Sequence, residues 1–340
     1  MTDVSLTCGF VPLADAGLLI AAVEQGFLAE EGVAVTLQRC ASWSSLADRL
    51  ATGLFDAAHL LSPLALAIQS GAMPLQADLV APFILGRDGN TLAATPALAD
   101  HCATHLAGAD DPAGLAQALR AWAGVRPLRV GVPFGASMHR LQLLDWLGPE
   151  AGDGLSTVVA PPSMLGDVMD EGEIDAFMVG EPYGSLAQAR GRATLLMPVR
   201  ALGQDLPEKL LGLRRDWCAA HPEALAAIGR AFLRTELWLT QPGATAELAD
   251  ILSRPDFLNL PPEAIRRAFD PDLTVMAGQA GRPVLRLGGN RWPDLLDTAA
   301  DWIPPRMGGE RAEESVYDLF DRRPLDSVLD GFEQRVLAPL

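Results

Sequence analysis

A short sequence pattern occurs twice in this chain with the same internal spacing. Residues 53–57 read Gly-Leu-Phe-Asp-Ala, and residues 172–176 read Gly-Glu-Ile-Asp-Ala. In each copy a proline, Pro63 or Pro182, follows the aspartate by seven positions. The glycine can end a helix in a left-handed conformation, the aspartate can enter a strand and the proline can open the next element. The pattern therefore predicts a helix–strand–turn unit that is used once in each of two lobes.

Apolar periodicity predicts strands and helices in alternation around both copies. Period-two patterns indicate strands at 4–11 and 33–37, with a helix at 18–24 between them. Residues 113–179 repeat this order, with a strand at 128–132 and a helix at 138–147, and the chain becomes mainly helical after Pro222. The 340 residues, 49% of them hydrophobic, are enough to bury two cores. We therefore expect an α/β protein with a mostly parallel sheet and helices on both of its faces.

The domain boundaries follow from where the chain is expected to cross between the lobes. We place the crossings near residues 91–95 and 193–200. Residues 1–92 then form the first part of lobe I, 93–195 form lobe II, and 196–340 complete lobe I with C-terminal helices. Because open α/β sheets bind ligands at the carboxyl ends of their strands, we expect a ligand site that draws on both lobes.

Charge restricts the partners of the chain. Its 43 acidic and 26 basic side chains give a formal net charge of −17, which repels nucleic acid and anionic lipid. We expect no direct nucleic-acid binding and, since no stretch approaches a membrane span, no membrane insertion. A small anion can still bind where a few hydrogen-bond donors converge.

The first residues predict the compartment. Residues 1–6 lack a basic segment and a continuous apolar segment, so we expect no export signal and a cytoplasmic protein if Met1 is the native start. A receptor from which a leader had been removed would begin in the same way.

Motifs for catalysis are missing from the sequence. It contains no G-x-S-x-G, H-E-x-x-H, Walker A or G-x-G-x-x-G motif placed after a strand. Its four cysteines, at positions 8, 40, 102 and 218, form no C-x-x-C pair and have no zinc-type spacing. We expect a protein that is not an enzyme and needs no cofactor or metal, with reduced and mostly buried thiols.

The segment from Gly135 to His139 is the strongest candidate for a binding site. It follows a predicted strand and opens a predicted helix, so Ser137 can cap that helix. Backbone N–H groups at a helix start attract anions, and His139 adds a donor. A capped helix with an idle histidine explains the same residues equally well.

Three further residues carry suitable chemistry. Trp43 lies between a strand and a helix, where its indole N–H can donate, although a loop tryptophan is more often a core residue. Lys209 precedes an apolar run and suits a monovalent anion, although most lysines are solvated. His59 occupies the first copy of the repeated unit, and we expect it to pack in the core.

These residues belong to blocks that resemble the nitrate-, nitrite- and bicarbonate-binding receptors of ABC transporters, NrtA and CmpA, and their cytoplasmic relative, the sensor NasS. The blocks include Gly-Phe-Val-Pro-Leu-Ala-Asp-Ala at 9–16 and Glu-Lys-Leu-Leu-Gly at 208–212. The others lie in order at 26–32, 41–43, 55–60, 89–90, 139 with 145–147, and 175–182. The chain departs from the family at Tyr183, where a tryptophan is usual, and around residues 289–293. The resemblance implies a two-lobed fold of the type II periplasmic-binding-protein kind.

The resemblance also implies a ligand set. Such receptors hold their anion with a tryptophan and a nearby backbone N–H, an amide, a histidine and a lysine, which match Trp43 with Ser45, Asn90, His139 and Lys209. In family members that bind bicarbonate, the position that resembles Lys209 holds an acidic residue, which helps to bind calcium. The lysine of this chain therefore implies nitrate or nitrite.

Resemblance to NasS implies a regulatory output. We expect a cytoplasmic sensor that sequesters an ANTAR-domain antiterminator, a NasT-like RNA-binding protein, and releases it when nitrate or nitrite binds. A transport receptor with its leader removed is the first alternative. An enzyme on the same bilobal scaffold is the second, because fold does not dictate function.

Overall fold

The computed structural model describes residues 4–108, 110–278, 281–308 and 310–336. The chain divides into two compact units, each with its own sheet. Unit 1 comprises Met1–Arg87, Leu206–Asn259 and Leu287–Leu340, and unit 2 comprises Asp88–Asp205 and Leu260–Arg286.

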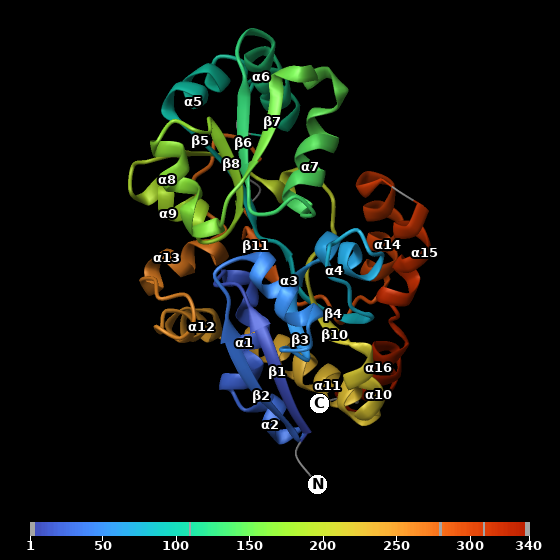
Figure 1. Cartoon of the computed structure of the whole chain (residues 1–340). Coiled ribbons are helices and arrows are strands. Elements are labelled where there is room, and N and C mark those ends of the chain that lie inside the picture. Colours follow the sequence, from blue (N-terminus) through green and yellow to red (C-terminus); the bar gives the residue numbers. More distant parts are fainter. Residues whose placement is uncertain (1–3, 109, 279–280, 309, 337–340) are drawn as a thin grey trace. The chain divides into compact units, whose positions relative to one another are not determined.

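Unit 1 is built on a sheet with strand order β11-β4-β10-β3-β1-β2 (Figure 1). Its strands are β1 (Val4–Phe10), β2 (Val33–Arg39), β3 (Ala57–Leu61), β4 (Leu79–Asp88), β10 (Pro207–Arg214) and β11 (Leu285–Leu287). Its first helices are α1 (Gly17–Glu24), α2 (Phe27–Glu30), α3 (Trp43–Ala51) and α4 (Ser62–Gln69). The later ones are α10 (Arg215–Ala220), α11 (Pro222–Leu239), α12 (Ala244–Leu252), α14 (Asp294–Met307), α15 (Glu310–Leu319) and α16 (Arg323–Val336). The predicted C-terminal helices are present, with α15 against α4 and α16 against α11.

Unit 2 has a sheet with strand order β7-β6-β8-β5-β9. Its strands are β5 (Asn90–Ala94), β6 (Leu128–Val132), β7 (Leu155–Val159), β8 (Ala176–Gly180) and β9 (Thr194–Pro198). Its helices are α5 (Pro96–Ala103), α6 (Pro112–Val125), α7 (Met138–Leu147), α8 (Leu165–Asp170), α9 (Tyr183–Ala189) and α13 (Pro262–Arg266).

The sheets are mixed: their strands are mostly parallel, as expected, but each sheet contains a reversed strand. Strands β1, β2 and β3 pair in parallel, as do β6, β7 and β8. Strand β10 is antiparallel to both β3 and β4, and β5 is antiparallel to both β8 and β9. Each reversed strand begins just after the chain has passed from the other unit, so it enters its sheet from the opposite end.

The repeated pattern forms the same structure in both units. Gly53 and Gly172 follow α3 and α8 with φ of 76° and 77°, as predicted for left-handed helix ends. Asp56 accepts a 2.8 Å hydrogen bond from the Thr7 backbone N–H in β1, and Asp175 accepts one of the same length from Arg129 in β6. Asp56 therefore ties the start of β3 to β1, and Asp175 ties the start of β8 to β6.

The unit boundaries differ from those expected. Residues 91–95 and 193–200, where we placed the crossings, lie in strands β5 and β9 of unit 2. The chain crosses at Arg87/Asp88 and Asp205/Leu206, and residues 260–286 form a further excursion into unit 2. This excursion is stabilised by tertiary contacts, such as the backbone bonds from Met276 and Ala277 to β9, which local sequence patterns do not reveal.

The region around 289–293, which departs from the family pattern, is held by a buried polar network. The Asn290 side chain bonds both backbone groups of Ile84 in β4, at 2.9 and 2.8 Å. Glu236 of α11 accepts from the backbone N–H groups of Gly289 and Asn290, each at 2.9 Å. This network fixes the chain next to β4.

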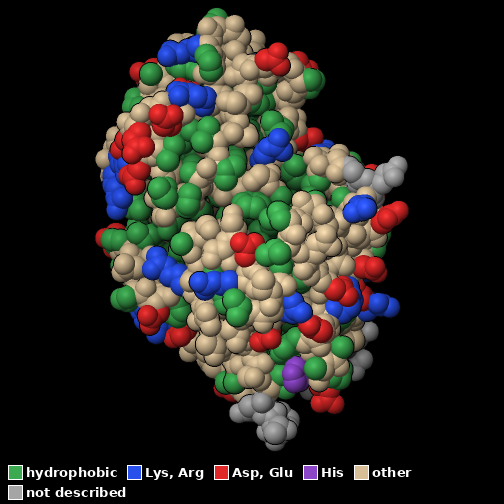
Figure 2. All heavy atoms as spheres, in the orientation of Figure 1, with side chains coloured by type: hydrophobic (Ala, Val, Ile, Leu, Met, Phe, Trp, Pro, Cys, Tyr) green, Lys and Arg blue, Asp and Glu red, His purple; other side chains and the backbone are tan. Residues whose placement is uncertain are grey.

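The burial of the cysteines agrees with the expectation from the sequence. All four cysteines are buried and free, and burial raises the pKa of Cys102 and of Cys218 to about 12. In the described part of the chain, no helix is long and apolar enough to cross a bilayer. On the face shown in Figure 2, Lys and Arg side chains lie interspersed with Asp and Glu.

Candidate functional site

In unit 1, five polar or aromatic side chains meet at the carboxyl ends of the parallel strands. They are Asp15 after β1, Trp43 at the start of α3 after β2, His59 in β3, and Glu208 and Lys209 at the start of β10. Because β10 is reversed, its first residues lie at the edge where β3 ends, and Lys209 pairs with Leu61, the last residue of β3. The sheet topology therefore brings together residues from four strands or their following turns.

Lys209 is the centre of this cluster. Its Nζ lies 2.8 Å from Asp15 Oδ2 and 3.0 Å from Glu208 Oε1. It also lies 5.7 Å from the ring centroid of Trp43, within the range of a cation–π contact. The His59 ring approaches Trp43 with 5.5 Å between ring centroids, and its Nε2 lies 3.1 Å from Asp15.

Burial and charge set the protonation states in the cluster. Lys209 and His59 are both 0% exposed. Burial acts to lower the pKa of Lys209, but the attraction of Asp15 and Glu208 outweighs it and the pKa is raised. Burial lowers the pKa of His59, which favours its neutral form. Burial acts to raise the pKa of Asp15, but Lys209 and His59 lower it below its ordinary range.

Two members of the cluster, Asp15 and Glu208, were not among the residues selected from the sequence. Asp15 lies in the sequence block at 9–16 that resembles the family. Its proximity to Lys209 depends on the pairing of β3 with both β1 and β10. Glu208 and Lys209 are neighbours in a strand, where successive side chains ordinarily point to opposite faces. Register shifts between β10 and β4 on both sides of Lys209 interrupt this alternation. His59, which we expected simply to pack, is a member of the cluster.

In unit 2, Asn90 and His139 lie at the corresponding edge of the sheet. Asn90 begins the reversed strand β5 and pairs with Gly180, the last residue of β8, just as Lys209 pairs with the last residue of β3. His139 is the second residue of α7, which follows β6, and it is 0% exposed. Ser137 caps α7 as predicted, accepting from the Arg140 N–H at 3.3 Å.

Two buried polar side chains at these edges form no hydrogen bond with the described residues. Within the described residues, neither the Asn90 amide nor the Trp43 indole Nε1 has a hydrogen-bond partner. Both residues are 1% exposed. Leaving a buried donor unpaired costs about 1–3 kcal/mol, so such groups call for a ligand or an ordered water.

Ser45 has a more limited role in the structure. Its backbone N–H donates to the Ser42 hydroxyl, which caps α3, at 3.2 Å. This N–H is already paired, so the structure does not present it as a free donor. The assignment of Trp43, Ser45, Asn90, His139 and Lys209 as one ligand set remains a prediction.

A buried carboxyl group lies at the end of β8. Glu181 accepts from Thr91 Oγ1 at 2.7 Å, from the Ser185 backbone N–H and from the Ser185 hydroxyl. Burial raises the pKa of Glu181, and these hydrogen bonds oppose the shift only in part. The network fixes the turn between β8 and α9.

Comparison with known proteins identifies the family. Residues 2–253 match the model of the NMT1-like family. The chain belongs to the NMT1-like family. The match covers unit 1 from residue 2 to residue 253 and the whole first segment of unit 2, Asp88–Asp205.

Curated relatives of this NMT1-like chain are anion-transport proteins by name. The nitrate/nitrite binding protein NrtA of Synechocystis is 30% identical over 269 residues, which cover 76% of this chain and 58% of NrtA. The bicarbonate transport ATP-binding protein CmpC of the same organism is 29% identical over 266 residues, covering 76% of this chain and 38% of CmpC. The chain thus spans little more than half of the length of NrtA and less than half of the length of CmpC. The resemblance to the nitrate/nitrite binding protein NrtA is confirmed.

A solved structure confirms the fold class. The crystal structure of the periplasmic nitrate-binding protein NrtA from Synechocystis matches with a TM-score of 0.80 at 22% sequence identity, covering 98% of this chain and 89% of that chain. The NMT1-like chain therefore has the periplasmic-binding-protein fold predicted from its sequence.

Proposed function

We propose that this protein binds nitrate or nitrite, and that Trp43, Ser45, Asn90, His139 and Lys209 are its ligand-binding residues. The observation that carries the proposal is the pair of buried donors, Trp43 and Asn90, that have no protein partner within the described residues. Nitrate offers three acceptor oxygens and no donor, so it can accept from both. The names of the NrtA relatives support the same class of anion.

The charge of the unit 1 cluster favours recognition by hydrogen bonds over simple charge neutralisation. With His59 neutral, the cluster contains one cation, Lys209, and two carboxylates, Asp15 and Glu208. An ammonium group has three N–H donors, and the two ion pairs leave one for a ligand. We propose that Lys209 donates this last N–H, while Trp43 and Asn90 provide neutral donors.

A titration of the purified protein with nitrate, nitrite and bicarbonate tests this proposal. We expect saturable calorimetric binding of nitrate or nitrite, and weaker binding of bicarbonate because position 209 is a lysine. Lys209→Ala should largely abolish binding, and His139→Ala should weaken it. Trp43→Phe and Asn90→Ala should each weaken it about tenfold or more, since a hydrogen bond to a charged group contributes about 1.5–3 kcal/mol.

Trp122→Phe is the matched control. Trp122 is also buried with an indole N–H that lacks a partner within the described residues, but it lies in α6, away from the carboxyl ends of the strands. It should leave the nitrate affinity unchanged. Because Lys209→Ala leaves two buried carboxylates without their cation, each variant is first checked for a folded circular-dichroism spectrum. Folded Trp43→Phe and Asn90→Ala variants with wild-type affinity would refute the site.

We further propose that the protein acts as a cytoplasmic sensor whose anion binding releases an ANTAR-domain antiterminator. The resemblance to NasS supports this output. The NrtA relatives favour an alternative, a solute receptor for an ABC transporter. The two outputs share the anion site and differ in the partner protein, so the partner experiment described below separates them.

A further inference from the structure

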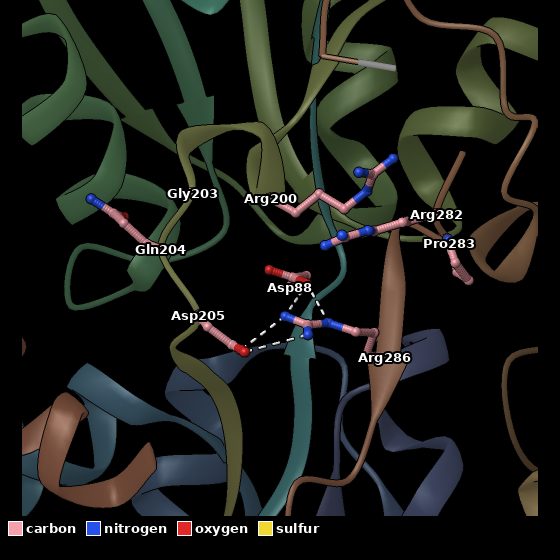
Figure 3. A pocket seen from close by; sticks show the side chains of 8 residues that line it. All are labelled: Asp88, Arg200, Gly203, Gln204, Asp205, Arg282, Pro283 and Arg286. Atoms are coloured by element: carbon pink, nitrogen blue, oxygen red, sulfur yellow. Dashed lines mark hydrogen bonds and ion pairs between the residues drawn. The ribbon is translucent and has the colours of Figure 1, made fainter. Parts of the chain in front are cut away.

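A cavity of about 150 Å³ is lined only by residues that the division of the chain assigns to unit 2, and none of them is proposed to bind nitrate. It is lined by Asp88, Arg200, Gly203, Gln204, Asp205, Arg282, Pro283 and Arg286 (Figure 3). Three arginines around one cavity are notable in a chain of net charge −17. The cavity therefore concentrates positive charge in an otherwise acidic protein.

One of the three arginines is neutralised by the protein itself. Arg286 Nη2 lies 2.7 Å from Asp88 Oδ2 and 2.8 Å from Asp205 Oδ1. These contacts fix the guanidinium between two carboxylates on one side of the cavity, as the dashed lines in Figure 3 show. Asp88 adopts a left-handed backbone conformation, with φ of 60°, which is uncommon outside glycine. Such conformations persist where surrounding contacts hold them, and here the ion pair with Arg286 does so.

The other two arginines of the cavity differ from Arg286 in their contacts with the described part of the chain. Within the described part of unit 2, neither Arg200 nor Arg282 forms an ion pair, and the buried Nε of Arg200 has no hydrogen-bond partner. Burial lowers the pKa of Arg200; Asp88 and, more weakly, Asp110 oppose this shift, while repulsion from Arg282 and Arg286 adds to it. An anion between these groups would relieve both the repulsion and the unpaired donor.

The size and charge of the cavity indicate the class of anion. Its volume corresponds to about five water molecules at roughly 30 Å³ each, which suits an oxyanion of five non-hydrogen atoms. The three arginines and two aspartates sum to a charge of +1. Guanidinium forks match the oxygen geometry of phosphate better than an ammonium group does.

We infer that this cavity binds a phosphate group, free or as a small phosphate monoester, through Arg200 and Arg282. The side chain of Arg282 is exposed, so the ligand can enter from solvent. Asp88 and Asp205 begin and end the first segment of unit 2, and Arg286 ends the second. The bound phosphate thus lies beside residues at which the chain passes between units, and the cavity lining does not include Trp43, Asn90, His139 or Lys209.

Calorimetric titration of the full-length protein with inorganic phosphate, in buffer free of phosphate and nitrate, tests the inference. We expect saturable binding that Arg282→Gln and Arg200→Gln each weaken about tenfold or more, because each removes a charge-assisted contact. Arg190→Gln, at an exposed arginine of unit 2 outside the cavity, is the matched control and should bind phosphate like the wild type. A parallel titration with phenyl phosphate identifies the source, since tighter binding of the ester indicates an esterified ligand and tighter binding of inorganic phosphate indicates the free ion.

Three results would overturn the inference. They are no saturable phosphate binding by the wild type, unchanged affinity in folded Arg282→Gln, and phosphate binding that nitrate displaces and Asn90→Ala removes. If Arg200→Gln does not fold, the exposed Arg282 still provides the test. Nitrate affinity should be the same in the wild type and both cavity variants, so failure of this inference and failure of the nitrate proposal are distinguishable.

Discussion

Lys209 shows how burial changes the role of a residue. A lysine read from sequence is a cation available to a ligand, whereas here it is fully buried and paired with Asp15 and Glu208. Removing one partner of a buried pair is far more costly than the net stability that the pair contributes. Each of these three charged residues is therefore needed for the stability of the fold, in addition to the proposed part of the cluster in binding.

The pKa of His59 gives a residue-scale prediction about pH. Burial lowers this pKa in the folded protein, whereas His59 of the unfolded chain keeps the ordinary value of about 6.5. At a pH between these two values, His59 is protonated in the unfolded chain and neutral in the folded protein. Stability must then fall as pH drops below about 6.5. We expect the melting temperature to decrease from pH 7.5 to pH 5.5, and His59→Gln to reduce that decrease by about 1–2 °C.

Differential scanning calorimetry of the wild type and His59→Gln at the two pH values measures this effect. His105→Gln, at an exposed histidine, is the control and should keep the wild-type decrease. An equal decrease in wild type and His59→Gln would show that His59 is not the titrating group.

At the scale of elements, the repeated glycines end helices by the same hydrogen bonds. After α3, the N–H of Gly53 bonds Leu50 O at 3.1 Å and the next N–H bonds Arg49 O at 2.9 Å. After α8, Gly172 bonds Met169 O at 3.0 Å and the next N–H bonds Val168 O at 3.1 Å. This pairing satisfies carbonyl groups that a helix end leaves free, and it requires a left-handed residue.

Alanine at these positions should destabilise both units similarly. An alanine Cβ at Gly172 would meet nothing within 4 Å, and one at Gly53 would only touch Arg214 at 3.8 Å, so the cost is that of the left-handed backbone. We expect Gly53→Ala and Gly172→Ala each to lower the free energy of unfolding by about 1 kcal/mol in urea denaturation.

Gly124 is the matched control for this pair. It lies within α6 without a positive φ, and a Cβ there also meets nothing within 4 Å. Gly124→Ala should therefore raise the free energy of unfolding by up to about 1 kcal/mol, because alanine favours helix. A loss of stability in Gly124→Ala equal to that of the other two would contradict the conformational explanation.

For the molecule as a whole, the proposed output is a coupling between anion and partner. If the partner binds the anion-free protein better than the anion-bound one, nitrate lowers the affinity for the partner. The partner then lowers the affinity for nitrate by the same factor. A shift from mostly bound to mostly free partner requires an affinity ratio of about 100-fold or more.

Size-exclusion chromatography of the protein mixed with an ANTAR-domain antiterminator measures the coupling. We expect a stable complex without nitrate and separate proteins at saturating nitrate. Asn90→Ala, which should bind nitrate weakly, serves as the control and should keep the complex at the same nitrate concentration. A complex that survives saturating nitrate would exclude release, and no complex at all would favour the transport receptor.

Local patterns in the sequence determined most of the elements and the family. Helix and strand periodicity, the two glycine caps and the Ser137 cap are properties of neighbouring residues, so they can be read before folding. The predicted Leu128–Val132 strand and Met138–Leu147 helix have the predicted bounds. The resemblance of ordered blocks then identified the receptor fold.

Only the tertiary structure decided which residues share an environment. The reversal of β5 and β10, the assignment of residues 260–286 to unit 2 and the pairing of Lys209 with Asp15 depend on contacts between distant segments. The arginine cavity likewise joins positions 88, 200 and 282. Hydrogen bonds and charges act through space, so a sequence can name candidate residues while the packed fold determines their partners.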